Sequence, residues 1–265
     1  DNRYVVKGEA GSPYAIKDYY DIDPDLAEEP STRMQEFEAL VTRTHEVGLK
    51  VVLDFVPNHV ARQYHSDTAP EGVDDLGAHD NNEMHFSPSN NFYYIPRQAF
   101  TLQFYIGEGE ERYFEYPAKA TGNDCFGAFP GEYDWYETVK LNYGVDYTGG
   151  GRCHFDPIPD TWYKMLDILL FWCGKGADAF RCDMAHMVPV EFWNWAISKV
   201  KENYPSVIFI AEIYDQALYR VYIEKGKFDY LYDKVGLYDK LRGVLCHQVS
   251  AAQLTYCWQS VDGIG

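Results

Sequence analysis

The sequence is short of basic residues. Lys and Arg together number 23 against 41 Asp and Glu, which gives a formal net charge of −18. A chain this acidic repels phosphate backbones and anionic membrane surfaces, which argues against nucleic-acid and membrane partners. The negative charge of the chain does not repel a neutral ligand.

Other absences exclude further classes of protein. The six cysteines form no C-x-x-C pair, which argues against zinc sites and thioredoxin-type redox sites. No glycine-rich phosphate loop follows any expected strand, which argues against a nucleotide-binding sheet. No apolar run reaches the roughly 18 residues that a membrane-spanning helix needs.

The sequence does not indicate where the protein is located. It shows no signal peptide, but it opens with Asp1, Asn2 and Arg3 instead of Met, so we expect a truncated N-terminus. Cytoplasmic and periplasmic or secreted locations therefore both stay open, as does the oligomeric state.

The sequence has a large apolar content, and expected strands and helices alternate along it. Apolar residues make up 46% of the 265 residues, enough for one large domain or one domain with an insertion. The pattern predicts strands near 51–56, 179–183, 207–212 and 228–232. It predicts helices from a Thr32/Gln35 capping box to Gly48, from an Asp160 cap to Gly174, from Pro189 onward, and near 216–225. Such repeated units indicate a parallel sheet, either open or closed into a barrel.

Residues 60–155 interrupt this alternation of strands and helices. The stretch is rich in Asn, Asp, Gly, Tyr and Phe, and it is too long for a loop without structure of its own. We therefore expect residues 1–59 and 156–265 to form one domain, part of the parallel sheet or barrel. Residues 60–155 would form an inserted small subdomain with irregular or short-stranded structure.

Three acids close expected strands, namely Asp54, Asp183 and Glu212. Carboxylates at several strand ends favour a barrel, whose active sites lie at the C-terminal face. Glycoside hydrolysis requires at least two carboxyl groups that face each other. Arg181, which shares a strand face with Asp183, is expected to lower the pKa of Asp183, and burial is expected to raise the pKa of Glu212. On spacing alone, other roles explain these residues equally well: a structural ion pair at a barrel rim for Arg181 and Asp183, and a helix N-cap or a surface carboxylate for Glu212.

The motifs around these acids resemble those of the α-amylase superfamily, glycoside hydrolase family 13. The segment Asp54-Phe-Val-Pro-Asn58-His59 resembles the D-x-x-x-N-H motif. Residues 180–183, Phe-Arg-Cys-Asp, and residues 209–212, Phe-Ile-Ala-Glu, resemble the motifs of the nucleophile and the acid/base. Tyr14, four residues before Asp18, resembles the substrate-stacking tyrosine.

The resemblance implies a (β/α)8 TIM-type barrel, with the insertion after the third strand, and a role for each matching residue. Asp183 would be the nucleophile, Glu212 the general acid/base, and Arg181 would orient Asp183. The other substrate-binding residues would be Tyr14, His59, Asp54 as a buried organiser, and His186. Asn58 matches a position that binds a structural calcium in many members, whereas no cofactor is required for the chemistry.

The sequence also departs from the family pattern. The third acid, an Asp in an H-D pair, has no counterpart, and His186-Met187 stands where Lys-His is common. We therefore expect the barrel to be incomplete in this chain and the third acid to lie outside it.

The expected function is retaining hydrolysis of α-glucosidic bonds in an α-glucan or α-glucoside, through a covalent glycosyl-enzyme. The alternatives are a transglycosylase of the same family, and a catalytically silent carbohydrate-binding barrel or inactive fragment.

Overall fold

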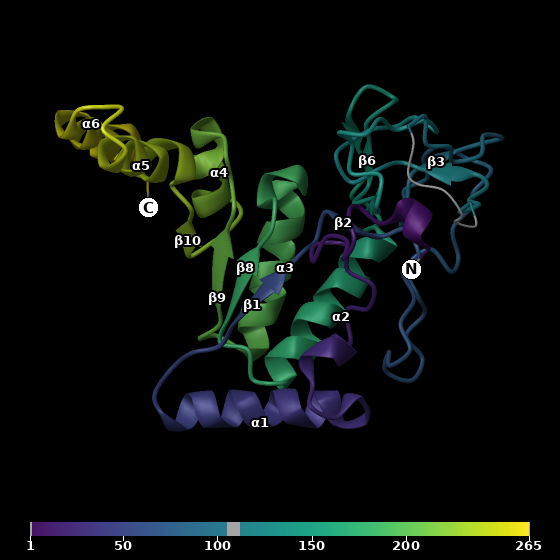
Figure 1. Cartoon of the computed structure of the whole chain (residues 1–265), viewed down its shortest axis with the longest axis horizontal. Helices are drawn as coiled ribbons and strands as arrows, with labels where there is room; N and C mark the ends of the chain where they lie inside the picture. The colour runs from purple at the N-terminus through teal and green to yellow at the C-terminus, as the bar shows by residue number, and fades with distance from the viewer. Residues whose placement is uncertain (1, 105–111, 265) are drawn as a thin grey trace.

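The centre of the molecule is a four-stranded parallel sheet (Figure 1). The structure, a computed structural model, describes residues 2–104 and 112–264. The strands lie in the order β1, β8, β9, β10, and all three pairings are parallel. Their bounds are Val52–Phe55 for β1, Ala179–Cys182 for β8, Ile208–Ala211 for β9 and Tyr230–Leu231 for β10. The four predicted strands are confirmed, and over the described residues they form an open sheet.

Helices α2 (Asp160–Gly174) and α3 (Val190–Asn203) pack against one face of this sheet (Figure 1). The rings of Phe55 and Trp193 lie 6.3 Å apart, and those of Phe180 and Phe209 lie 5.6 Å apart. Both predicted helices are confirmed, and the apolar residues predicted to line them are buried. They are Trp162, Met165, Leu166, Leu169, Trp172 and Cys173 in α2, and Phe192, Trp193, Ala196, Ile197 and Val200 in α3.

The opposite face of the sheet is more open. Val52 and Ile208 remain 50% and 37% exposed, whereas Phe180, Cys182 and Phe209 on the helix-covered face are buried. The alternation of side chains along the strands therefore places Asp54, Arg181 and Glu212 on the open side.

Two predicted helix caps are wrong in detail. The side chain of Thr32 does not cap α1 (Arg33–Glu46), because Pro30–Thr32 already form a 3-10 turn, η3, and Thr32 lacks the extended backbone of a cap. Glu36 instead accepts hydrogen bonds from the N–H groups of Glu28 and Glu29. Asp160 is the first residue of α2 and not its cap, and it accepts a hydrogen bond from Asn91.

In residues 59–104 and 112–153, the structure describes three antiparallel pairs of short strands. They are β2 (His59–Ala61) with β5 (Thr138–Lys140), β3 (Tyr94–Ile95) with β4 (Ala118–Lys119), and β6 (Val145–Asp146) with β7 (Arg152–Cys153). This region forms the lobe at the upper right of Figure 1. It has a second hydrophobic core, which includes Tyr93, Tyr136 and, from the N-terminal segment, Val5.

The remaining elements are short helices. Helix α4 (Tyr219–Glu224) follows the turn η5 (Gln216–Leu218), as the sequence predicted. The sequence did not predict the helical C-terminal part, which comprises η6 (Lys234–Tyr238), α5 (Asp239–Leu245), η7 (Ala251–Gln253) and α6 (Leu254–Val261). Three further 3-10 turns are η1 (Arg3–Val5), η2 (Pro24–Leu26) and η4 (Ala185–Met187). Within the described residues, no helix is long and apolar enough to span a bilayer.

Candidate active site

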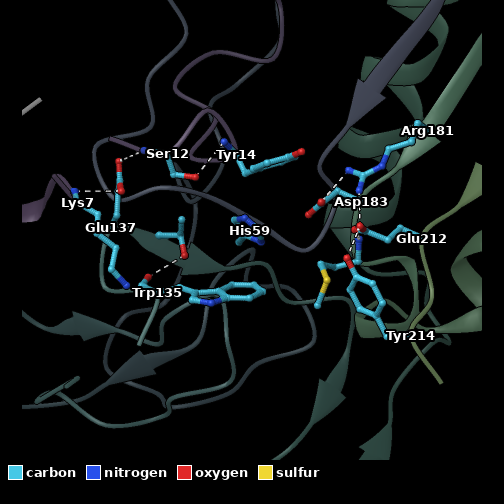
Figure 2. A pocket seen from close by; sticks show the side chains of 12 residues that line it. Lys7, Ser12, Tyr14, His59, Trp135, Glu137, Arg181, Asp183, Glu212 and Tyr214 are labelled. Carbon is cyan, nitrogen blue, oxygen red and sulfur yellow. Dashed lines mark hydrogen bonds and ion pairs between the residues drawn. The ribbon is translucent and has the colours of Figure 1, made fainter. Parts of the chain in front are cut away.

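A pocket of about 410 Å³ opens where β8 and β9 end. Four parts of the chain line it: the N-terminal segment, the start of β2, the β5 region, and the ends of β8 and β9 (Figure 2). Its lining residues are Lys7, Ser12, Tyr14, His59, Trp135, Glu137, Thr138, Arg181, Asp183, Met184, Glu212 and Tyr214.

Asp183 and Glu212 continue the hydrogen-bond ladder of the sheet by one residue beyond the strands. The N–H of Asp183 donates to the carbonyl of Phe55 at 2.8 Å, and the N–H of Glu212 donates to that of Cys182 at 3.0 Å. Both side chains are nearly buried, with exposures of 8% and 9%. The sheet thus fixes both backbones at the pocket floor.

The guanidinium of Arg181 joins three carboxylates. Its Nη1 donates to Oδ1 of Asp183 at 2.8 Å and to Oδ1 of Asp54 at 3.0 Å, and its Nη2 lies 2.5 Å from Oε1 of Glu212. The expectation that Asp54 is buried is wrong, since its side chain is 46% exposed. Asp54 lies on the open face of β1, at the edge of the described sheet, so only Arg181 covers it.

The predicted order of the two pKa values is also wrong. Burial raises the pKa of Asp183 to about 7, and the neighbouring charge of Glu212 adds to that rise. The pKa of Glu212 is lowered despite its burial, because the hydroxyl of Tyr214 donates to it at 2.6 Å and the N–H of Met184 at 3.1 Å. The two carboxyls also share a hydrogen bond, which places the shared proton on Asp183. Arg181 contacts both acids, so its charge does not set their pKa values apart.

Met184 donates one of these hydrogen bonds from a strained backbone. Its φ of 44° and ψ of 41° lie in the left-handed region, which a non-glycine residue rarely adopts. That conformation turns its N–H toward Oε2 of Glu212. Strain of this kind persists where the surrounding structure fixes it, often at functional sites.

His59 and Tyr14 lie in the same pocket as the acids, as the sequence predicted. His59 is only 3% exposed, and burial together with the charge of Lys140 lowers its pKa to about 4, so the ring is neutral near pH 7. A side chain at Gly122 would meet Cβ of His59 at 2.9 Å, so that glycine leaves room for the ring. Tyr14 stays 39% exposed, and its ring lies 5.8 Å from Cζ of Arg181.

The structure does not bring His186 into the pocket lining. His186 lies in η4, and its ring packs edge-on against that of Tyr214 at 6.3 Å. Asn58 is buried behind the pocket; its Nδ2 donates to the carbonyl of Gly122 at 2.8 Å, and its Oδ1 accepts from Nζ of Lys140 at 2.6 Å.

Sequence reasoning missed the wall opposite the acids. Glu137, 6% exposed, accepts hydrogen bonds from the N–H groups of Lys7 at 3.1 Å and Ser12 at 2.9 Å (Figure 2). The ring of Trp135 lies 5.2 Å from that of His59. The only sequence signal for this wall was the abundance of aromatic residues, at 17%.

Comparisons with known proteins relate this chain to α-amylases. The family model described as the α-amylase catalytic domain matches residues 7–114. An α-1,4-glucan:maltose-1-phosphate maltosyltransferase from Cereibacter sphaeroides is 36% identical over 107 residues, which cover 38% of this chain and 18% of the relative. A protein of the same description from Pseudomonas aeruginosa is 24% identical over 233 residues, or 85% of this chain and 26% of the relative.

Solved structures extend the similarity to nearly the whole chain. An α-amylase from Lactobacillus plantarum superposes with a TM-score of 0.58 at 25% identity, covering 97% of this chain and 48% of that one. A cyclic α-maltosyl-(1→6)-maltose hydrolase from Arthrobacter globiformis has the same fold, with a TM-score of 0.62 at 18% identity, covering 97% of this chain and 47% of that one. The chain thus spans about half the length of these structures and a smaller part of the curated relatives. The motifs that meet in the pocket and these similarities thus agree on the α-amylase superfamily, glycoside hydrolase family 13, as the family that this chain resembles.

Proposed function

We propose that this protein cleaves α-glucosidic bonds with retention of configuration, through a covalent glycosyl-enzyme. The observation that carries the proposal is the convergence of Asp183 and Glu212 around Arg181 at the ends of neighbouring strands in one pocket. Two carboxyls on either side of a scissile bond supply a nucleophile and an acid, the minimum that this reaction needs.

In the first step, a carboxylate oxygen of Asp183 forms a bond to the anomeric carbon as the bond to the leaving oxygen breaks. Glu212 gives its proton to that oxygen. In the second step, Glu212 takes a proton from water, which attacks the anomeric carbon and releases Asp183. Neutral His59 would contact sugar hydroxyls, and Tyr14 would stack against the ring.

This chemistry requires a charged Asp183 and a protonated Glu212, the reverse of their order in the free protein. The two carboxyls share a hydrogen bond in this structure, whereas retaining enzymes keep them about 5 Å apart. A glycosidic oxygen entering between them would separate the pair and accept a hydrogen bond from Glu212. Substrate binding would therefore move the proton to the acid/base.

The proposed framework is a (β/α)8 barrel with an inserted domain. The parallel sheet and helices of residues 1–59 and 156–265 would belong to the barrel, domain A, and residues 60–155 to domain B. A second core, which lies mainly within residues 60–155 and includes Val5, supports an inserted domain. Other residues of the same stretch pack in the main core, among them Val60, Val139 and Leu141. The substrate would be an α-glucan or an α-glucoside.

Transfer to a sugar acceptor is the second candidate function. The curated relatives are described as maltosyltransferases acting with maltose 1-phosphate, so the glycosyl-enzyme of this protein could be intercepted by a sugar hydroxyl in place of water. Hydrolysis and transfer share the first step and differ only in the acceptor.

The test uses the purified protein with 4-nitrophenyl α-maltoside, and separately with maltose 1-phosphate plus maltohexaose. We expect an α-configured first product by proton NMR and a loss of turnover on the order of 10³-fold or more in Asp183→Asn and Glu212→Gln. Asp239→Asn, an exposed acid outside the pocket, is the control. A β-configured first product, or full activity in Asp183→Asn, would refute the proposal, while chain extension of maltohexaose would assign transfer.

A further inference from the structure

Lys140 is a buried lysine held by two oxygen atoms from different parts of the chain. It lies on β5 opposite His59, and its side chain is 1% exposed. Its Nζ is 2.6 Å from Oδ1 of Asn58 and 2.6 Å from Oδ1 of Asp124. The ring of Tyr147 lies 5.4 Å from the same nitrogen.

The groups around the ammonium of Lys140 are ones that bind a cation. Asn58 turns its oxygen toward Nζ because its Nδ2 is committed to the carbonyl of Gly122 at 2.8 Å, which fixes the orientation of the amide. Asp124 has a φ of 64°, a backbone conformation uncommon for a residue with a side chain. An ammonium group offers three donors, and here an amide oxygen, a carboxylate oxygen and an aromatic face surround it.

The same residues do not fit a calcium ion. Calcium takes six to eight oxygen ligands, yet the side-chain oxygen of Asn58 already accepts from Lys140. The described residues contain no group of three or more His, Cys, Asp or Glu that could hold a metal. Asp134 and Asp146, the other acids that could have contributed, are engaged with Asn123 and Gly149.

We propose that the ammonium of Lys140 is a built-in structural cation, which takes the place that the family resemblance gives to calcium at Asn58. Asn58 follows β1 of the parallel sheet, Lys140 lies on β5, and Asp124 lies in the loop after β4. One positive charge thus ties the small-stranded region to the sheet and fixes the segment that carries His59. The inference concerns stability and does not depend on the proposed reaction.

The first test measures thermal unfolding of the wild-type protein with about 5 mM calcium chloride and with about 5 mM EDTA. A ligand that binds only the folded protein raises its melting temperature. We expect the two melting temperatures to agree within about 1 °C, because the site already holds its own cation. A rise with calcium, or a fall with EDTA, would overturn the proposal.

The second test replaces Lys140 with methionine, which keeps much of the volume and removes the charge. Leaving Asn58 and Asp124 without their partner should lower the melting temperature by roughly 6 °C or more. Hydrogen exchange should become faster in residues 58–61 and 121–125. Unchanged exchange in these two segments would contradict the proposed tie.

Two further variants complete the design. Lys119→Met removes a partly buried lysine, 19% exposed, which lies 3.7 Å from Glu115, and is expected to leave exchange in residues 58–61 unchanged. Asp124→Asn removes only the charge of the more exposed partner and serves if Lys140→Met does not fold. It should speed exchange in residues 121–125, and the absence of that effect would count against the proposal.

Discussion

The hydroxyl of Tyr214 donates a hydrogen bond of 2.6 Å to Oε1 of Glu212. This bond is one of the causes that lower the pKa of Glu212, because it stabilises the carboxylate and not the acid. The residue that must protonate a leaving group is thus held in its charged form in the free protein. Tyr214, which the sequence did not single out, therefore helps to set the pH range in which the proposed acid works.

Replacing Tyr214 with phenylalanine should shift the acid limb of kcat/KM to higher pH by about one unit, because Glu212 is the first of the two acids to lose its proton in the free protein. Removing a hydrogen bond to a charged group costs roughly 1.5 kcal/mol, and about 1.4 kcal/mol corresponds to one pKa unit. The measurement is a pH–rate profile on 4-nitrophenyl α-maltoside. Tyr230→Phe, at an exposed position on the same sheet, is the matched control, and identical profiles for both variants would refute this role.

Asp183→Asn should make the protein more stable at pH 8 while it removes activity. The pKa of Asp183 is about 7 when folded and about 3.9 when unfolded, so the folded chain holds more protons between these values. Stability therefore falls as pH rises through this window, by roughly 2 to 4 kcal/mol in total. Asparagine carries no charge to bury, so the variant should melt several degrees higher at pH 8.

That advantage should disappear at about pH 3, below both pKa values, where Asp183 keeps its proton in the folded and the unfolded state. Melting curves of the wild type and the variant at four or five pH values give the comparison. A constant difference across the pH range would show that the gain does not come from titration of Asp183.

Arg181→Leu should destabilise the protein strongly at pH 8 and less at pH 5. Removing the guanidinium leaves the nearly buried carboxylates of Asp183 and Glu212 without their shared cation, which costs about 3 to 5 kcal/mol. At lower pH the carboxyls can take up protons, so part of the loss is recovered. Denaturant unfolding at both pH values measures the loss of stability. Arg220→Leu, which breaks an exposed ion pair with Glu224, is the control.

Glu137→Gln should loosen the N-terminal side of the pocket. An amide in place of the carboxylate can accept only one of the two hydrogen bonds from Lys7 and Ser12 with its oxygen. We expect faster hydrogen exchange in residues 7–14, and a KM raised severalfold with kcat little changed. Glu132→Gln, at an exposed position nearby, should alter neither quantity.

The sequence predicted those parts of the fold that depend on local patterns. Alternation along 179–183 and 207–212 was enough to identify the strands and to place Asp183 and Glu212 at their ends. Helical spacing identified α2 and α3, because Trp162, Trp193 and their neighbours repeat with the period of a helix.

Features that depend on contacts between distant segments could not be predicted in this way. The register that sets Asp54 opposite Arg181 brings a third carboxylate to the guanidinium, and nothing within either strand specifies it. The pKa order of the acids likewise depends on Tyr214 and on the backbone of Met184, whose directions are known only from the folded structure. Glu137 joins the pocket across more than a hundred residues, and its own segment carries no periodic signal.

The two hydrophobic cores have a consequence for how such a pocket can change. The acids rest on the core between the sheet and its helices, whereas Tyr136, beside Trp135 and Glu137, belongs to the second core with Val5. Substitutions in the wall of Trp135 and Glu137 would thus disturb the second core, whereas substitutions beneath the acids would disturb the first. Substitutions can therefore change the substrate preference at one wall while the wall with the acids keeps its geometry. Trp135 and its neighbours are thus the positions to choose for redesign.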